Sequence, residues 1–326
     1  MSALPHIPSD HPDLRGLPDH PDLREEPTAE PGVGPVAAAV VEPGVGPVGG
    51  SVVEPEIDAV AAPVAEPGVE AAVATVAESG PAPGLLWYLT EPTRTAVGLG
   101  QFAATRSLLR AAPSGDGHTV LVLPGLGATD ASTATLRKFL TGLGYDVHGW
   151  GLGLNIGPSV GVVRGMRELL RELAVGGKVS IVGWSLGGIF ARELAREHPG
   201  TVRQVITLGS PYAMTDLRQT RVNPVYRLLA RFYVSGADLP PPEHTRPPFP
   251  VPSTSVYSKS DGIVAWQTCI STPGARQQNV AVNSSHLGYG YNATVLWLIA
   301  DRLSQRHHRW RPFTPPPGMA RMFPDA

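Results

Sequence analysis

The feature that most constrains the fold is an unbroken apolar run, VLVL at residues 120–123, that stops at a Pro-Gly pair. A strand that is apolar on both faces is typical of a parallel sheet covered by helices on each side. Further strand-like runs then alternate with helical patterns up to residue 304. This alternation predicts an α/β fold with a doubly wound, mostly parallel sheet.

The expected elements can be placed along the chain. After VLVL, strands are predicted at 145–150, 178–183, 202–208, 253–258 and 278–283, and helices at 93–111, 133–142, 160–174, 186–197 and 293–304. The alternation breaks over residues 212–250, where one helical piece at 225–233 precedes the proline-rich PPPEHTRPPFP. We expect this segment to form a small lid above the edge of the sheet.

The first 84 residues differ sharply from the rest. They contain no Phe, Trp or Tyr, 15 prolines, and two basic against 14 acidic residues, with short repeats of DHPDLR and EPGVGPV. Such a segment cannot bury enough apolar area to offset its ordering entropy. We therefore expect a disordered acidic Pro/Gly/Ala-rich tail at 1–84, an α/β domain at 85–304 with its lid at about 212–250, and a poorly ordered, basic Pro/aromatic tail at 305–326. A specific docking role for the acidic tail is the alternative.

Composition excludes several classes of protein. Cys269 is the single cysteine, so neither an intramolecular disulfide nor a cysteine zinc site can form, and the sequence implies no metal or organic cofactor. A net charge of -2 indicates no nucleic-acid partner. No signal peptide and no apolar run long enough for a membrane span is visible. We expect a cytoplasmic protein, although export by another route would leave no trace here.

The motif Gly183-Trp184-Ser185-Leu186-Gly187 carries the first chemical signal. It follows the apolar strand VSIV and opens the helix GGIFARELARE. This strand–turn–helix setting is typical of a nucleophile elbow, in which side chains at the flanking glycines would clash with the strand or the helix. From the motif alone, an ordinary tight turn with a serine at the helix cap is the alternative.

Two later residues complete the pattern that a serine nucleophile needs. Asp261 follows the strand TSVYS in SKSDG, and His286 follows NVAVN in NSSHLG. Both fall after predicted strands, at the carboxyl edge of the sheet, in the order serine, acid, histidine. Taken singly, Asp261 could be a plain turn residue and His286 a surface histidine. Their joint order and position favour a Ser185-Asp261-His286 triad.

A developing oxyanion needs backbone donors. The amide of Leu186, directly after the serine, is one candidate, and the amide of Leu126 in Pro124-Gly125-Leu126-Gly127 is the other. A phosphate-binding loop at Gly-Leu-Gly is disfavoured because no Lys-Ser/Thr follows. The apolar residues next to these motifs predict a substrate pocket formed by Trp184, Ile263, Val264 and Leu287.

Together LVLPGLGA, VGWSLGG, SKSDGIV and NSSHLGYGYN resemble bacterial lipase/esterase-like members of the α/β-hydrolase superfamily, over about residues 118–304. The resemblance implies Ser185 as nucleophile, Asp261 as acid, His286 as base, and Leu126 and Leu186 as oxyanion donors. Two departures stand out. Pro-Gly replaces the His-Gly of many such lipases, and little sequence precedes VLVL that could form two antiparallel strands, as in the minimal lipases with a six-stranded core.

The expected function is a serine hydrolase that cleaves carboxylic esters, with a small-molecule or lipid ester as substrate. Two alternatives stay open: an acyltransferase with the same triad, and a non-catalytic binding protein on a hydrolase scaffold. The basic, aromatic residues 307–311 predict peripheral contact either with an anionic membrane surface or with the acidic N-terminal tail.

Overall fold

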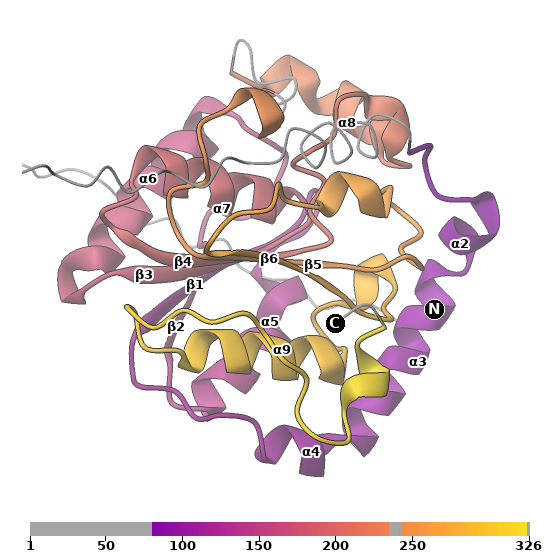
Figure 1. Ribbon diagram of the computed structural model, residues 1–326. Coiled ribbons are helices and arrows are strands. Elements are labelled where there is room, and N and C mark those ends of the chain that lie inside the picture. Colours follow the sequence, from indigo (N-terminus) through magenta and orange to yellow (C-terminus); the bar gives the residue numbers. More distant parts are fainter. Residues whose placement is uncertain (1–79, 235–240, 242, 325–326) are drawn as a thin grey trace, which may run out of the picture. The chain divides into compact units, whose positions relative to one another are not determined.

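The computed structural model describes residues 80–234, 241 and 243–324. Six strands form one sheet in the order β2-β1-β3-β4-β5-β6, and every neighbouring pair is parallel (Figure 1). The strands are β1 (Thr119–Leu123), β2 (Asp146–Gly149), β3 (Val179–Trp184), β4 (Val202–Leu208), β5 (Ser253–Tyr257) and β6 (Gln277–Ala281). This arrangement confirms the predicted doubly wound sheet of the α/β-hydrolase fold with six core strands.

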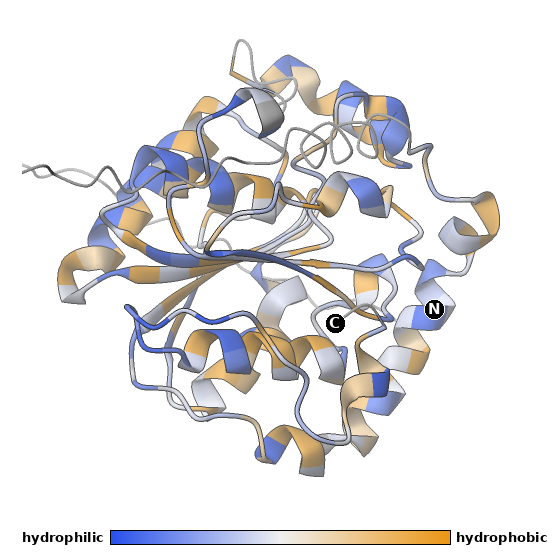
Figure 2. Ribbon diagram, in the orientation of Figure 1, coloured by the Kyte–Doolittle hydropathy of each residue, from blue (hydrophilic) through white to orange (hydrophobic). Residues whose placement is uncertain are grey.

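Two helices cover each face of the sheet. α5 (Asp130–Gly142) and α9 (Ala293–Ser304) lie on one face, and α6 (Val160–Leu173) and α7 (Leu186–Glu197) lie on the other (Figure 1). Side chains of successive strand residues point to opposite faces. In β3, Val182 therefore packs in the core under α5 and α9, whereas Ile181 packs under α6 and α7. Hydrophobic and hydrophilic residues alternate along α6 and α7, as expected for helices with one solvated side (Figure 2).

Side-chain caps fix where several of these helices begin. The Thr129 hydroxyl accepts from the amide of Ala131 at the start of α5, and Ser159 accepts from Val162 in the first turn of α6. Asn292 accepts from two amides in the first turn of α9. These caps satisfy amides that have no partner within the helix.

From residue 80 on, where the description begins, three helices precede the sheet: α2 (Leu85–Leu89), α3 (Glu91–Ala104) and α4 (Arg106–Arg110). The single helix expected at 93–111 is interrupted at Thr105, whose hydroxyl bonds back to the carbonyl of Gln101. The Arg94 side chain of α3 donates to the carbonyl of Ser260, 2.6 Å away, in the loop after β5. Nearly all of the predicted acidic tail lies outside the described residues.

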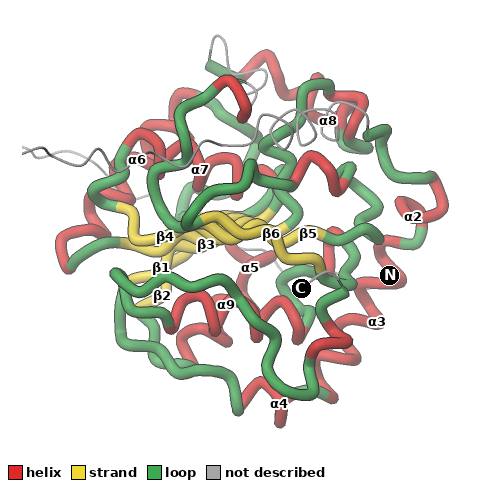
Figure 3. The backbone as a smooth tube through the Cα atoms, viewed as in Figure 1, coloured by secondary structure: helices red, strands yellow, loops and turns green. Residues whose placement is uncertain are grey.

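The segment after α9 corrects an expectation from composition. Its many prolines and basic residues predicted poor order, yet it lies against the domain as a long irregular stretch beside α9 (Figure 3). Phe313, Met319 and Phe323 are buried in the core under that helix. The Gln278 side chain bonds the backbone of Phe313 through both its oxygen and its nitrogen. Three widely spaced apolar anchors hold a segment whose described residues contain a single short 3-10 helix, Ala320–Met322.

The described residues of the predicted lid form one α-helix, α8 (Asn223–Leu229), and short 3-10 turns. The chain that follows α8 is joined to the domain by a bridge between Ser159 and Tyr233 and by the hydrogen bond from the Val234 amide to the Pro158 carbonyl. Residues 235–240 and 242 of the predicted lid lie outside the description. Over the described ranges, no helix combines the length and the apolar character needed to cross a membrane.

Candidate active site

The turn at Ser185 is strained in the way that the motif predicts. Ser185 has φ 53° and ψ -121°, and no other non-glycine residue in the described part of the chain has a positive φ. A Cβ at Gly183 would overlap the Gly187 carbonyl, and one at Gly187 would overlap the Leu123 carbonyl. Strand, turn and helix therefore approach too closely for any side chain at the two glycines. The turn places Ser185 at the carboxyl end of β3.

Asp261 and His286 form a buried pair. Asp261 Oδ2 lies 2.7 Å from His286 Nδ1, and the two side chains are only 1% and 5% exposed. Asp261 Oδ1 accepts from the amides of Ile263 and Val264 at 2.8 and 2.9 Å. With both carboxylate oxygens occupied, the aspartate is fixed in one orientation. The bond to Nδ1 favours the imidazole tautomer whose Nε2 is free to accept a proton.

The surroundings of His286 act on its pKa in opposite directions. Burial alone would lower the pKa, because it disfavours the charged ring. The Asp261 carboxylate, through its charge and its hydrogen bond, and the charge of Glu91 together outweigh burial, so the pKa lies above its ordinary value. The ring is therefore a stronger base than a free histidine.

The serine turn meets the Asp261–His286 pair through shared contacts. The Ser185 amide donates to the Leu208 carbonyl at the end of β4. A Cβ on the next residue, Gly209, would lie 3.1 Å from Asp261 Oδ2. Trp184 Nε1 donates to the His286 carbonyl at 3.0 Å. Among the hydrogen bonds of the described residues, none joins Ser185 Oγ to the His286 ring, and such bonds often tighten only when substrate binds.

Glu91, which the sequence did not single out, holds the acid and base loops together. Its carboxylate is 2% exposed and accepts from the amides of Gly262 (2.8 Å), His286 (2.9 Å) and Leu287 (3.0 Å). Arg94 donates to the same carboxylate at 2.8 Å. One buried side chain from α3 thus fixes the residue after the acid and the backbone of the base. No local sequence pattern predicts this role, because the three amides that donate to Glu91 lie 171 to 196 positions away along the chain.

Serine hydroxyls add a second connection between the same two loops. Ser258 Oγ donates to the Ser284 carbonyl at 2.7 Å and accepts from the Ser284 amide at 3.1 Å. Ser260 Oγ donates to the same carbonyl at 3.2 Å. The positions of Asp261 and His286 relative to each other are therefore set by several bonds besides their own.

The loop of residues 124–128 lies against the serine. A Cβ at Gly125 would be 3.2 Å from Ser185 Cβ. Within the described residues, the amides of Leu126 and Leu186 donate to no protein acceptor. Two free amides, one beside the serine and one at the first residue of α7, are what a developing oxyanion requires.

Asn155 is a second residue that sequence analysis missed, and it holds loop 124–128 in place. It is fully buried, and its Nδ2 donates to the Pro124 carbonyl at 2.8 Å. Its backbone amide donates to the Ala128 carbonyl and its carbonyl accepts from the Gly127 amide, both at 2.8 Å, while its Oδ1 accepts from Gly157 at 3.1 Å. These four bonds hold loop 124–128 in one conformation, in which the Leu126 amide has no acceptor among the described residues.

A mostly apolar cavity of about 290 Å³ opens beside Leu186, between α6, α7 and the lid. It is lined by Pro158, Val163, Met166, Arg167, Leu186, Ile189, Phe190, Glu193, Leu194, Glu197, Met214, Tyr226, Val234 and Pro241. None of the four predicted pocket residues lines it. Trp184 points into the core under α5 and α9, Ile263 and Val264 pack beside Tyr257, and Leu287 is exposed. Adjacency in sequence placed these residues near the motifs, but strand alternation and the loop turns direct them elsewhere.

The end of the predicted lid is fixed to α7 by a buried charge cluster. Glu243 bonds the guanidinium groups of Arg192 and Arg196 at 2.9 and 2.8 Å. Burial would raise the pKa of Glu243, but the two arginines lower it below its usual value. The Arg192 guanidinium also lies over the rings of Tyr212 and Phe249, at 3.9 and 4.0 Å from their centres. These contacts join the residues that end the lid to α7.

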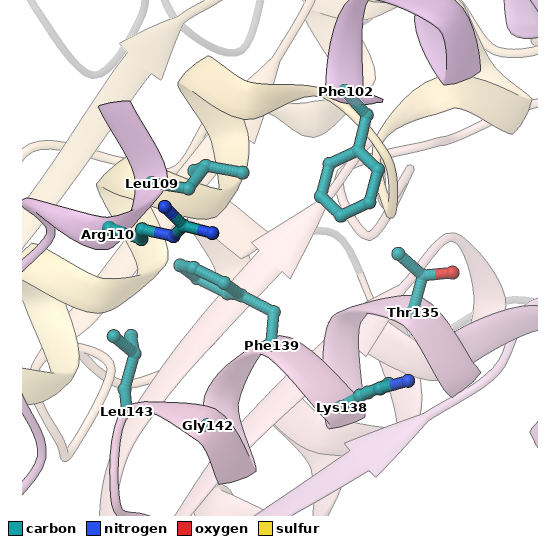
Figure 4. Close-up of a pocket in the computed structure, with 8 residues that line it drawn as sticks. All are labelled: Phe102, Leu109, Arg110, Thr135, Lys138, Phe139, Gly142 and Leu143. Carbon is teal, nitrogen blue, oxygen red and sulfur yellow. The ribbon is translucent and has the colours of Figure 1, made fainter. Parts of the chain in front are cut away.

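A larger groove, of about 680 Å³, lies on the other side of the sheet, between α3, α4 and α5 (Figure 4). It is lined by Phe102, Leu109, Arg110, Thr135, Lys138, Phe139, Gly142 and Leu143. None of these belongs to the predicted site. Size alone therefore does not locate the chemistry of this fold.

Neither a protein-family model nor a curated protein sequence matches the chain. Among solved structures it is similar to lipase B of Aspergillus fumigatus, with 17% identity and a TM-score of 0.44 over 60% of this chain. It spans only 56% of that lipase. It is also similar to a lipase-esterase related protein from Clostridium acetobutylicum (14% identity, TM-score 0.42, 59% of this chain and 97% of that one) and to the thioesterase domain of the curacin biosynthetic pathway (14%, 0.40, 58% and 92%). The fold assignment rests on the chain's own strand order and turn geometry.

Proposed function

We propose that the chain is a serine hydrolase that cleaves carboxylic esters through Ser185, His286 and Asp261. The observation that carries this proposal is the buried 2.7 Å bond between Asp261 and His286, next to a serine held at positive φ. A tight turn that merely capped a helix would need neither the strain at Ser185 nor a buried acid–base pair beside it.

The steps follow from the atoms present. Ser185 Oγ attacks the ester carbonyl while its proton passes to His286 Nε2. Asp261 keeps Nδ1 protonated and stabilises the imidazolium that forms. The imidazolium then gives its proton to the departing alkoxide, which leaves as the alcohol, and an acyl-Ser185 ester remains. Water, deprotonated by His286, attacks this ester and releases the acid and the free serine.

Charge that develops on the carbonyl oxygen is stabilised by two amides. The free N–H groups of Leu126 and Leu186 support this role, since no protein acceptor in the described residues competes for them. Asn155 fixes the Leu126 side of the hole and the strained turn fixes the Leu186 side. Because both are set before substrate arrives, little reorganisation is needed in the transition state.

The cavity beside Leu186 supports an ester with an apolar acyl part. Its side chains at Ile189, Phe190 and Met214 are apolar, and Tyr226 of the lid helix closes one side. A volume of about 290 Å³ lies near the lower end of the range for small-molecule sites. We infer that short to medium acyl chains, including those of lipid esters, fit better than long ones.

A fluorophosphonate probe tests the proposal most directly. The purified full-length chain is treated with the probe and the adduct is located by mass spectrometry. We expect labelling at Ser185, with loss of labelling in His286→Ala, and the same requirement for hydrolysis of p-nitrophenyl esters. Glu168→Gln, an exposed change on α6, serves as the matched control and keeps full labelling. Well-folded protein that neither takes the label nor hydrolyses any ester would overturn the proposal.

The acyl chain has its own test. Met214→Trp fills part of the cavity beside Leu186, and we expect hydrolysis to shift toward acetyl over octanoyl esters by about tenfold or more. An unchanged preference, with Ser185 still reactive, would show that the acyl chain lies elsewhere and would leave the triad assignment standing.

A further inference from the structure

A second pocket, of about 360 Å³, lies at the opposite edge of the sheet from Ser185. We call it the amino-edge pocket, because it sits where β3 to β6 begin. Lys178 precedes β3, Arg203 lies near the start of β4, and Arg276 precedes β6. The segment after α9 adds His307 and His308. Five basic side chains thus converge, and none of the described residues that line the pocket is acidic.

Most of this positive charge is not neutralised by any of the described residues. Lys178 and Arg276 make no ion pair with any described residue, and Arg276 donates only to the Pro250 carbonyl, at 3.2 Å. Arg203 does pair, with Asp116 at 3.2 Å, and also donates to the Gln305 carbonyl at 2.7 Å. Lys178 and Arg276 are both exposed, so their side chains are free to turn toward a ligand.

Three hydrogen-bonding nitrogens of lining residues also lack partners. These are Arg203 Nε, Trp310 Nε1 and His307 Nδ1, which are buried and have no hydrogen-bond partner in the described part of the chain. Native proteins leave few buried donors unsatisfied, and each such group calls for an explanation. A bound oxyanion supplies the acceptors that are missing, after small side-chain rotations.

The pKa of His307 is lowered from its ordinary value, partly by the same positive charges. Burial is the largest cause that lowers it, and the positive charges of Lys178, His308, Arg203 and Arg276 lower it further. Lys178, Arg203 and Arg276 act in the same direction on this imidazole, as expected where the local potential is positive. A negatively charged ligand would relieve this repulsion.

We propose that the amino-edge pocket binds a phosphate group. A carboxylate offers two oxygens and one charge, fewer than the cations and free donors present. A phosphate offers three terminal oxygens and close to two negative charges at neutral pH, and it suits Arg, Lys and His donors arranged around it. The group is carried either by a soluble phosphate compound or by the headgroup of an acidic lipid. The proposal is independent of the ester chemistry at the opposite edge.

The first experiment uses inorganic phosphate and the full-length chain in isothermal titration calorimetry. We expect saturable binding by the wild type that weakens about tenfold or more in Lys178→Gln/Arg276→Gln. The control Lys138→Gln/Arg227→Gln removes two exposed positive charges from α5 and α8, far from the pocket, and should bind within about twofold of the wild type. Thermal midpoints of all three proteins verify folding. No saturable binding by the wild type, or equal losses in both double variants, would overturn the proposal.

A second arm distinguishes the two sources of phosphate. Phosphatidylcholine vesicles with phosphatidic acid are sedimented with each protein. Wild-type binding that is lost in Lys178→Gln/Arg276→Gln and displaced by inorganic phosphate assigns the pocket to a lipid headgroup. Binding of inorganic phosphate without vesicle binding assigns it to a soluble compound. Vesicle binding that both double variants retain equally would overturn a headgroup role for the pocket.

Discussion

The two edges of the sheet handle charge in opposite ways. At the carboxyl edge, the buried carboxylates of Asp261 and Glu91 each accept bonds at both oxygens, and His286 is paired. At the amino edge, Lys178 and Arg276 have no charged partner among the described residues. Burying charge without a partner is costly, so a fully paired edge is organised before any ligand arrives. The amino edge instead keeps charge available for a ligand.

The strongest test of the organised edge is Ser185→Ala. We expect the rate of ester hydrolysis to fall by about 10³- to 10⁶-fold, since members of a triad act as a unit. Ser185→Gly should be equally inactive but about 1 kcal/mol more stable than Ser185→Ala, because glycine accepts φ 53° without strain. Urea unfolding and ester hydrolysis measure both. Equal stability of the two variants would argue against strain at this turn, and substantial activity in either would exclude the serine as nucleophile.

Glu91→Gln tests whether the carboxyl edge depends on a residue that touches no reacting atom. Three amides and Arg94 lose a buried charged acceptor, so we expect unfolding free energy to fall by about 3 kcal/mol and kcat by about 10- to 100-fold. Glu91 raises the pKa of His286. Its removal lowers that pKa, so the acid limb of the kcat/KM profile should move to lower pH.

Glu168→Gln is the control for that prediction. Glu168 is 51% exposed and lies 3.9 Å from Arg164, so its loss should change stability by at most about 0.5 kcal/mol and leave the pH profile in place. If Glu91→Gln lowers stability yet keeps the wild-type acid limb, Glu91 is a structural residue and does not tune the base.

Whether a feature could be predicted depends on how close together in the sequence the residues that determine it lie. The strand of VLVL and the turn at Ser185 are encoded by contiguous residues, and both were predicted. The order serine, acid, histidine also placed Asp261 and His286 at strand ends, where the structure pairs them. Glu91 was missed because it looks like any acidic residue in the first turn of a helix, and its burial depends on loops far along the chain.

The same reason explains two other misses. Asn155 sits in the glycine-rich GLGLNIGP, where composition suggests only a turn, and its bonds to loop 124–128 cross from another part of the fold. In the C-terminal segment, the average composition hid Phe313 and Phe323, which act as single anchors. Average composition predicts disorder well only when no individual side chain has a cavity to fill.

Asn155→Ala should have a smaller effect than Glu91→Gln. The loop that presents the Leu126 amide would lose its bond to the Pro124 carbonyl but keep the backbone pairing of residue 155. We expect kcat to fall about tenfold with KM nearly unchanged, because an oxyanion donor acts in the transition state. Steady-state kinetics with a p-nitrophenyl ester measure the split. A rise in KM at constant kcat would place Asn155 in substrate binding instead.

The smallest expected effect is the pH dependence of anion binding at the amino-edge pocket. An anion bound beside His307 would offset the field of Lys178, Arg203, Arg276 and His308 and raise the pKa of His307 above its lowered value in the free protein. Binding is then coupled to proton uptake, so affinity should rise as pH falls. Sulfate, which stays a dianion throughout, should bind about three- to tenfold more tightly at about pH 5 than at about pH 8.

His307→Gln should reduce that pH dependence, while the mutation Lys138→Gln should not alter it. Calorimetry at both pH values provides the measurement. Wild-type affinity that is equal at the two pH values would mean that no proton is taken up on binding. The amino edge would then be a cluster of fixed charges. It would differ from the carboxyl edge, where His286 Nδ1 is hydrogen-bonded to Asp261, only in that its charged groups lack charged partners.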